Sequence, residues 1–311
     1  MFDPLHYGLF FGPQQTQRAR RNQKRAPLRE AWARLREPAP TGTLAQVQWA
    51  GLRYRLDDDP APAAPLIAAL ADLPHSTASL PGYPETARAL IAAQCIELLR
   101  DHPELPPNAL TAALDALAQR AAEFDALPGD APLLDTLWHI TFNVAAGVTL
   151  ADEARFQAAV DAYRQAVDRH IHPEGYLPRA IAGEDAASLE RQLMAAQALV
   201  LTAEIAAHAG TDLWRYHNRG VSVLTAVTYP LYYYFYPEKW PWSGEESLAL
   251  ETTQARFRQR AGYLELAAER YERPLRAIQM ILDECRPVVD MLGGGLPTLT
   301  HGQPERRGLF G

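Results

Sequence analysis

An imidazole and an amide stand one helical turn apart at His139 and Asn143. Residues four apart on a helix share a face, so these two side chains can act on the same bound group. Both are hydrogen-bond donors, and together they suit a carboxylate. The structural alternative is a half-buried histidine that is satisfied by its asparagine neighbour. Trp138 lies beside the pair in sequence.

The most unusual composition of the chain lies between residues 229 and 244, where five tyrosines and two tryptophans fall within sixteen positions. Sugars stack their C–H faces on aromatic rings, and tyrosine adds a hydroxyl that can hydrogen-bond. Consecutive rings cannot all face one side, so some of them must fill gaps between helices. We expect Trp138 and part of this segment to bind substrate, and at least two rings of the segment to border a central cleft. The candidate rings of the segment are Tyr232, Tyr233, Tyr234, Tyr236, Trp240 and Trp242.

Metal-ligand residue types alternate at His170, His172 and Glu174. This spacing suits a strand better than a helix end, and a fourth ligand is missing, so we expect no metal and no cofactor. The two cysteines, Cys95 and Cys285, lie far apart in apolar surroundings. A disulfide framework and a cysteine-based zinc site are therefore excluded as interpretations. The sequence also lacks a phosphate-binding glycine loop, a nucleophile elbow and a two-histidine zinc helix.

Helices must position these residues. The chain has 311 residues, 48% of them hydrophobic. Leucine and alanine dominate, β-branched residues are sparse, and many of the predicted helices begin at or just after proline. Short connections make successive helices antiparallel neighbours, and the absence of a fixed-period repeat favours a ring over a solenoid. We predict an all-α, incomplete α/α toroid of about ten to eleven antiparallel helices over residues 1–292, followed by a glycine-rich C-terminal tail at 293–311.

The charge balance narrows the class of partner. A formal net charge of −7 argues against a dedicated nucleic-acid binder. No uncharged apolar stretch reaches the roughly 20 residues of a membrane span, so we expect no membrane partner. The first residues lack the pattern of a signal peptide, which predicts a cytoplasmic protein as written, or a periplasmic or secreted one if a leader has been trimmed. The oligomeric state stays open.

Several short motifs follow one another in a recognisable order between about residues 130 and 302. They include Leu-Trp-His at 137–139, Pro-Glu-Gly-Tyr-Leu-Pro at 173–178, Asp-Leu-Trp-Arg-Tyr at 212–216 and Glu-Lys-Trp-Pro-Trp at 238–242. In this order they resemble the alginate lyase family of polysaccharide lyases, which are helical toroids. The start of the chain, Leu-Phe-Phe-Gly at 9–12 before an arginine-rich helix, is similar to the opening of the same family.

The resemblance implies β-elimination on a uronic acid. In that reaction Asn, His or Arg donors neutralise the carboxylate beside C5, a tyrosine or histidine removes the C5 proton, and a tyrosine protonates the departing oxygen. Tyr232 to Tyr234 could also supply the acid or base. The principal candidates for the catalytic roles are His139, Asn143, Arg179, Arg191 and Tyr176.

The sequence departs from the family at the positions that match the family's catalytic residues. The family places an Asn-His pair ahead of the tryptophan of the middle helix, where residues 134–138 read Leu-Asp-Thr-Leu-Trp. It also has an Arg, and a His-Tyr pair that opens the helix after the glycine-proline loop, where residues 188–192 read Ser-Leu-Glu-Arg-Gln. The order of the motifs indicates a lyase acting on a uronate-containing polysaccharide such as alginate. Because the catalytic pairs of the family are missing, two alternatives stay open.

The first alternative is a catalytically inactive toroid that binds a saccharide or a protein partner. The second is a glycoside hydrolase that uses two carboxylates. An anionic or neutral saccharide is the expected partner of the lyase. The carboxylates open to the hydrolase are Asp135, Glu174, Glu184 and Asp185.

Overall fold

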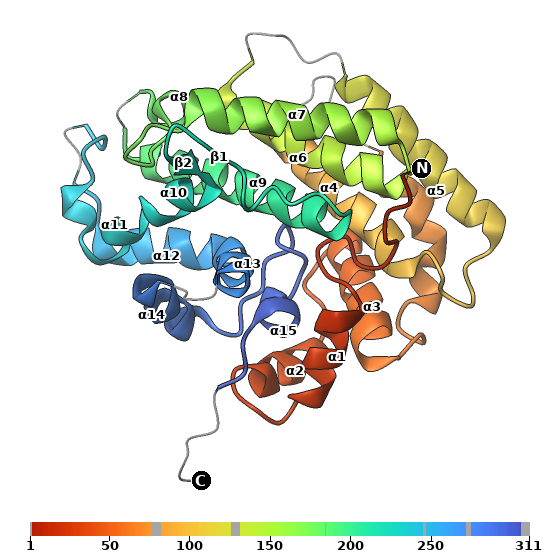
Figure 1. Ribbon diagram of the computed structural model, residues 1–311. Helices are drawn as coiled ribbons and strands as arrows, with labels where there is room; N and C mark the ends of the chain where they lie inside the picture. Colours follow the sequence, from red (N-terminus) through yellow and green to blue (C-terminus); the bar gives the residue numbers. More distant parts are fainter. Residues whose placement is uncertain are drawn as a thin grey trace.

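The computed structural model describes residues 2–75, 82–125, 131–183, 185–244, 247–271 and 275–305. Over these residues the chain forms fifteen α-helices, two short 3-10 helices and one two-stranded hairpin (Figure 1). The all-α prediction is confirmed. The hairpin pairs β1 (His217–Asn218) with β2 (Val221–Ser222) in antiparallel register.

The helices follow one another in short steps. The first half of the chain contains α1 (Pro13–Arg21), α2 (Leu28–Arg36), α3 (Thr43–Asp57), η1 (Ala64–Asp72), α4 (Tyr83–Leu99), α5 (Pro107–Phe124) and α6 (Leu133–Thr149). The second half contains α7 (Glu153–His170), α8 (Pro178–Ile181), α9 (Ser188–His208), α10 (Val223–Thr228), α11 (Leu231–Phe235), η2 (Pro237–Lys239), α12 (Leu250–Arg260), α13 (Gly262–Arg270), α14 (Arg276–Cys285) and α15 (Pro297–His301).

The number of α-helices exceeds the expected ten or eleven for two reasons: two long helical stretches are each divided, and the short helices α8, α11 and α15 add to the number. The arginine-rich segment after residue 12 forms two helices, α1 and α2, since Pro27 between them cannot continue the backbone hydrogen-bond ladder. Residues 250–270 likewise form two helices, α12 and α13, which are divided just before Gly262. The backbone there lies so close to the Asp290 side chain that a Cβ atom on Gly262 would collide with it.

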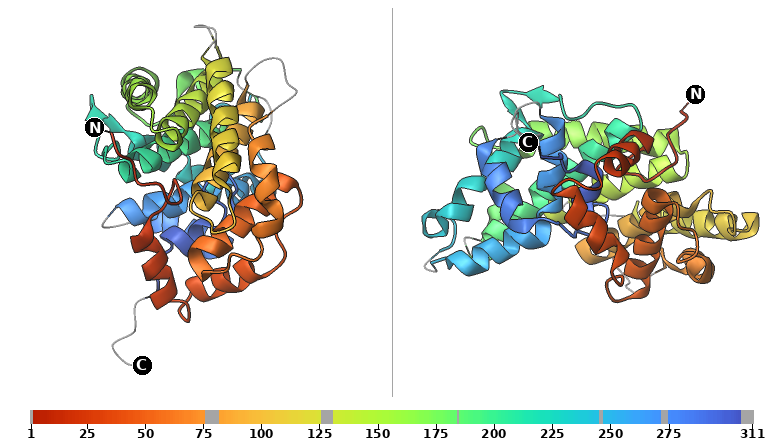
Figure 2. Two further views of the ribbon diagram at one scale, coloured as in Figure 1. Left: turned by 90° about the vertical axis from the view of Figure 1, so that its right-hand side faces the viewer. Right: turned by 90° about the horizontal axis from the view of Figure 1, so that it is seen from below.

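Seven helices close into a ring. In order, α3 packs against α4, α4 against α6, α6 against α9, α9 against α13, and α13 against α15. Helix α15 then reaches α1, which packs against α3 (Figures 1 and 2). Helix α7 covers α6 from outside, and α5 covers η1 and α4. The predicted α/α toroid is confirmed.

The central helices α4, α6 and α9 are buried on almost every side. Nearly all residues of α9 from Leu193 to Ala206 are buried, and α4 is buried continuously from Ala89 to Leu99. Helix α7, in contrast, buries only a stripe of residues that recurs every three or four positions. A helix that is apolar all round belongs in the interior, whereas a striped helix belongs at the surface. The burial pattern thus separates inner from outer helices.

A glycine turn fills the interior of the ring. Asp290 and Gly295 form a β-bridge, and Gly293 to Gly295 are buried between them. The turn needs glycine because Gly294 and Gly295 have φ values of 97° and 90°. A Cβ on Gly295 would also lie 2.6 Å from Leu52. The expectation of a tail from residue 293 therefore differs from the structure, in which residues 293–302 are buried in the ring; residues 306–311 lie outside the described part.

Within the described ranges, none of the helices combines the length and the apolar character needed to cross a membrane.

Candidate functional site

Three central helices, α4, α6 and α9, begin at the same end of the ring. In the first turn of α6, Asp135 accepts a hydrogen bond from the backbone N–H of Tyr83, the first residue of α4, at 2.9 Å. One turn further, the Trp138 ring meets the Tyr83 ring edge-on with 5.0 Å between centroids. The positive ends of helix dipoles meet here, and this favours an anionic group.

Arg260 joins these helix ends. Its Nη1 donates to the Tyr83 hydroxyl at 3.5 Å, and its Nη2 donates to Glu190 Oε1 in the first turn of α9 at 2.9 Å. Arg256, one turn earlier on α12, lies 3.9 Å from the other oxygen of Glu190. The Glu190 side chain is 33% exposed, so solvent reaches the group. We call Tyr83, Asp135, Glu190, Arg256 and Arg260 the helix-end cluster.

Buried polar groups behind the cluster fix the position of the Arg260 side chain. Gln197 accepts from Arg260 at 3.2 Å through its Oε1 and donates to Asp290 at 3.0 Å through its Nε2. The Asp290 carboxylate also accepts the backbone N–H groups of Leu292 and Gly293, both at 3.1 Å. Burial raises the pKa of Asp290 to about 6, although these hydrogen bonds favour its ionised form. The glycine turn therefore fixes the position of the Arg260 guanidinium.

The charge state of Arg260 is secure. Burial works to lower its pKa, but the hydrogen bonds and charges of Tyr83 and Glu190 outweigh burial and raise it. A guanidinium that stays charged and half-enclosed is suited to bidentate contact with a carboxylate. A phenol beside it supplies a group that can exchange a proton. The helix-end cluster thus combines an anion-binding and a proton-transfer group.

His139 and Asn143 lie in a separate cavity of about 400 Å³ between α6 and α7. The Asn143 amide nitrogen is 3.0 Å from His139 Nε2, and its oxygen accepts from Arg155 at 2.6 Å. Arg155 in turn holds Asp125 with two hydrogen bonds of 2.7 and 2.8 Å. Burial lowers the pKa of His139. In the described residues, neither His139 nor Asn143 contacts Arg179 or Arg191 through a hydrogen bond.

The two predicted arginines are held by backbone carbonyls. Arg179 donates to Ala131 O at 3.2 Å. Arg191 donates to Ala180 O at 2.8 Å and Ala182 O at 3.0 Å, and it pairs with Asp185 at 3.0 Å. Arg191 therefore braces the segment around α8.

The remaining carboxylates of the hydrolase alternative are spread apart. Asp135 accepts the Tyr83 N–H, Asp185 pairs with Arg191, and Glu174 is exposed on the loop before α8. Glu184 lies outside the described residues. In the loop, His172 Nδ1 accepts a 3.3 Å hydrogen bond from the Glu174 backbone N–H and its ring stacks on Tyr176.

The predicted rings separate into an exposed and a buried group. Trp138 and Tyr234 are fully buried, and Tyr234 donates to Glu284. Tyr232 and Tyr236, in contrast, are 46% and 47% exposed. The other rings form one continuous series with the exposed pair, in which each ring touches the next. We call this series the aromatic track: His172, Tyr176, Trp242, Trp240, Tyr233, Tyr232 and Tyr236.

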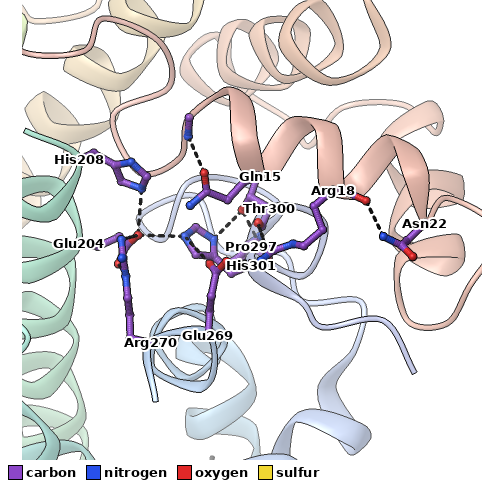
Figure 3. A network of polar contacts seen from close by, with 11 residues as sticks. Gln15, Arg18, Asn22, Glu204, His208, Glu269, Arg270, Pro297, Thr300 and His301 are labelled. Atoms are coloured by element: carbon purple, nitrogen blue, oxygen red, sulfur yellow. Dashed lines mark hydrogen bonds and ion pairs between the residues drawn. The ribbon is translucent and has the colours of Figure 1, made fainter. Parts of the chain in front are cut away.

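Figure 3 shows a second polar centre, at the other end of α9. Glu204 is completely buried and lies 3.0 Å from His208 Nε2 and 3.3 Å from His301 Nε2. These three residues have the chemistry of a metal site. Both Glu204 oxygens, however, already accept from the Arg270 guanidinium, and one also accepts the indole N–H of Trp214 at 3.0 Å. The arginine supplies the positive charge that a metal would bring, and the centre ties α9 to α13 and α15.

Sequence reasoning missed Tyr83, Arg256 and Arg260. The two arginines stand four apart on α12, a spacing that places both on one face and could have indicated a paired site. Tyr83 carried no such signal, because its role depends on the start of α4 meeting the start of α6. Glu190 lies in the stretch that the resemblance had marked as catalytic, one position before Arg191.

Comparisons with known proteins agree with this architecture. The model of the alginate lyase family matches residues 136–240, which confirms the resemblance. A variant of alginate lyase A1-III complexed with tetrasaccharide is 20% identical, with a TM-score of 0.69, over 85% of this chain and 76% of that one. The alginate lyase A1-III from Sphingomonas species A1 is 19% identical, with a TM-score of 0.71, over 84% and 76%.

An alginate lyase from Bacteroides ovatus is 13% identical, with a TM-score of 0.70, over 94% of this chain and 98% of that one. At these identities the solved structures show a shared fold. No curated protein matches the chain.

Proposed function

We propose that this protein is a polysaccharide lyase that binds a uronate-containing polymer at the helix-end cluster and cleaves it by β-elimination. The observation that carries the proposal is the contact between the Tyr83 hydroxyl and the Arg260 guanidinium, 3.5 Å apart. Asp135 and Glu190, which flank this contact, come from the two stretches where the family resemblance locates the chemistry.

Each group of the cluster has a role in this proposal. Arg256 and Arg260 bind the uronate carboxylate and neutralise its negative charge, so the C5 proton becomes more acidic. Tyr83, in its phenolate form, takes the C5 proton as general base. As the C5–H bond breaks, its electron pair forms the double bond to C4, and the bond from C4 to the glycosidic oxygen breaks. The Tyr83 phenol formed in this way then donates the proton to the departing oxygen as general acid.

Glu190 regulates access to the arginines. It holds Arg260 at 2.9 Å and lies 3.9 Å from Arg256, so an incoming carboxylate must compete with it. The three helix N-termini attract either anion, so they stabilise the site before and after the exchange. Competition of this kind makes binding depend on ionic strength.

The test is an assay of unsaturated product. Wild-type protein is incubated with polymannuronate, polyguluronate and polygalacturonate, and ultraviolet absorbance follows the new double bond while a reducing-end assay counts total cleavage. The lyase proposal predicts equal numbers of double bonds and reducing ends for at least one polymer. Reducing ends without double bonds would support the hydrolase alternative and reject the lyase.

A binding toroid without catalysis is the second candidate. It is favoured by Arg191, which stands where the resemblance calls for a His-Tyr pair and is engaged by the carbonyls of Ala180 and Ala182. Binding of a uronan without any cleavage product would support this candidate.

A further inference from the structure

The aromatic track is continuous over a long path on one side of the molecule. Ring centroids are 4.3 Å apart from His172 to Tyr176, 4.6 Å from Tyr176 to Trp242 and 5.2 Å from Trp242 to Trp240. The path continues to Tyr233, Tyr232 and Tyr236, with steps of 4.8, 5.3 and 5.0 Å. Such spacing is typical of favourable contacts between aromatic rings.

Only part of the track is needed to fill the core. Trp240 is 3% exposed and packs as a core residue, whereas Tyr232 and Tyr236 each leave nearly half of their surface in solvent. His172, Tyr176, Tyr233 and Trp242 are half-buried. The buried tryptophan therefore supports rings whose outer surfaces stay free. Exposed tyrosines on a fixed base are suited to the C–H faces of sugars.

Lys239 adds a positive charge at one end of the track. Its Nζ donates to the Tyr232 hydroxyl at 2.9 Å and lies 5.0 Å from the centroid of the Tyr236 ring. The hydrogen bond occupies one of three N–H donors of the ammonium group, so two remain for a carboxylate. The neighbouring Glu238 is exposed and carries the opposite charge. Adjacent residues thus offer a matched pair for testing the charge of a ligand.

The middle of the track lies beside the helix-end cluster. Ser188, the first residue of α9, accepts the indole N–H of Trp240 and donates to Trp242 O, both at 2.7 Å. Glu190 of the cluster is two residues further along the same helix. The first turn of α9 is therefore shared by the track and the cluster.

We propose that the aromatic track and Lys239 form a second saccharide-binding surface, which holds a uronate polymer outside the helix-end cluster. The proposed function identifies the polymer, and this inference rests on it for that point. Sugar rings stack on the exposed tyrosines at α11, and Lys239 pairs with a uronate carboxylate. A polymer spans both surfaces and gains affinity from the linkage, whereas an oligosaccharide that occupies the cluster alone does not.

The experiment measures binding directly, by titration calorimetry with polymannuronate and with a mannuronate tetrasaccharide. Tyr83→Phe is the background, so that cleavage does not interfere. In this background the double change Tyr232→Ala and Tyr236→Ala is expected to weaken polymer binding about tenfold, because it removes both exposed stacking surfaces. Tetrasaccharide binding is expected to stay unchanged.

The charge pair supplies the control. Lys239→Gln is expected to weaken polymer binding about threefold and to reduce its salt dependence, whereas Glu238→Gln leaves binding equal or tighter. Polymer affinity that is unchanged in the double tyrosine variant would overturn the inference, as would an equal loss for polymer and tetrasaccharide. Circular dichroism of each variant shows whether the fold is intact.

The two proposals fail in different ways. If wild-type protein shows no double-bond product but its polymer affinity depends on the tyrosines, the track is supported and the lyase is rejected. If product forms and the tyrosine variants bind polymer like wild type, the lyase is supported and the track is rejected.

Discussion

The Tyr83 hydroxyl lies 3.5 Å from the Arg260 guanidinium, although 177 residues separate them in the chain. Tyr83 is the first residue of α4 and Arg260 is the last of α12. Trp138 supports the phenol ring from α6, and Gln197 supports the guanidinium from α9. Four helices are thus needed to bring this phenol to this guanidinium.

Removing the Tyr83 hydroxyl tests its catalytic role. Tyr83→Phe keeps the ring on Trp138, so the melting temperature is expected to stay nearly unchanged. Turnover of a uronan is expected to fall by about 10²- to 10⁴-fold, the usual contribution of general acid–base catalysis. Tyr54→Phe is the matched control, because its hydroxyl bonds Asp101 O away from the cluster. Activity that survives Tyr83→Phe would exclude Tyr83 from proton transfer.

Glu190 and Arg260 should have opposite effects on affinity. Glu190→Gln removes the negative charge that occupies Arg260, so uronan binding is expected to tighten several-fold at low salt. Arg260→Gln is expected to weaken binding at least tenfold, because charge-assisted contacts are about twice as strong as neutral ones. Dissociation constants at two salt concentrations measure both effects. Weaker binding in Glu190→Gln would contradict the proposed competition.

His139 is expected to stabilise the fold and to have no role in ligand binding. Alanine at this position leaves a cavity beside Phe124 and unpairs the Asn143 amide, which costs on the order of 1–3 kcal/mol. Chemical denaturation measures this loss, and uronan binding of the folded variant should be intact. If binding disappears while the unfolding free energy is unchanged, His139 belongs to a ligand site instead.

His139 also makes the free energy of unfolding depend on pH. Burial lowers the pKa of His139 in the folded state, so the unfolded chain binds a proton more readily. Its contribution to stability is full above the unfolded pKa of about 6.5 and is lost as pH falls from there through the lower folded value. His139→Gln should remove this part of the slope when unfolding free energies are compared between wild type and variant.

Asp290 should produce the opposite slope at lower pH. Burial raises its pKa to about 6, above the ordinary value of an aspartate, so the folded state holds a proton that the unfolded state has released. Stability from this residue is present below pH 4 and decreases as pH rises to about 6. Asp290→Asn should remove this change in the free energy of unfolding with pH. A variant whose pH profile matches wild type in this window would show that Asp290 is ionised throughout.

The helical class and the ring could be predicted because they depend on local signals. Proline starts, leucine–alanine composition and short connections were enough to predict an all-α toroid. Gly262 and the glycine turn could not be interpreted in the same way. Their function depends on close approach to Asp290 and Leu52, which are distant in sequence or in a different element.

The candidate site was harder to predict for a geometric reason. His139 and Asn143 were correctly placed on one helix face, where they contact each other. Which neighbour that face meets depends on the packing of α6 against α7, and Arg155 was not foreseen there. Likewise, the consecutive tyrosines at 232–234 were recognised as a mixture, but only the packing of α11 determines that Tyr234 points inward and Tyr232 outward.

The closure of the ring through α15 sets an order of assembly. Arg18 of α1 bonds Glu269 and the carbonyl of Thr300, and the N–H of Glu305 bonds Ala26 O at 2.9 Å. During synthesis the first helices therefore keep one apolar face exposed to solvent until almost the whole chain has been made. Contacts of such large sequence separation close late and slowly. A nascent chain arrested before residue 297 should thus expose the inner surfaces of α1 and α13 and be a target for chaperones.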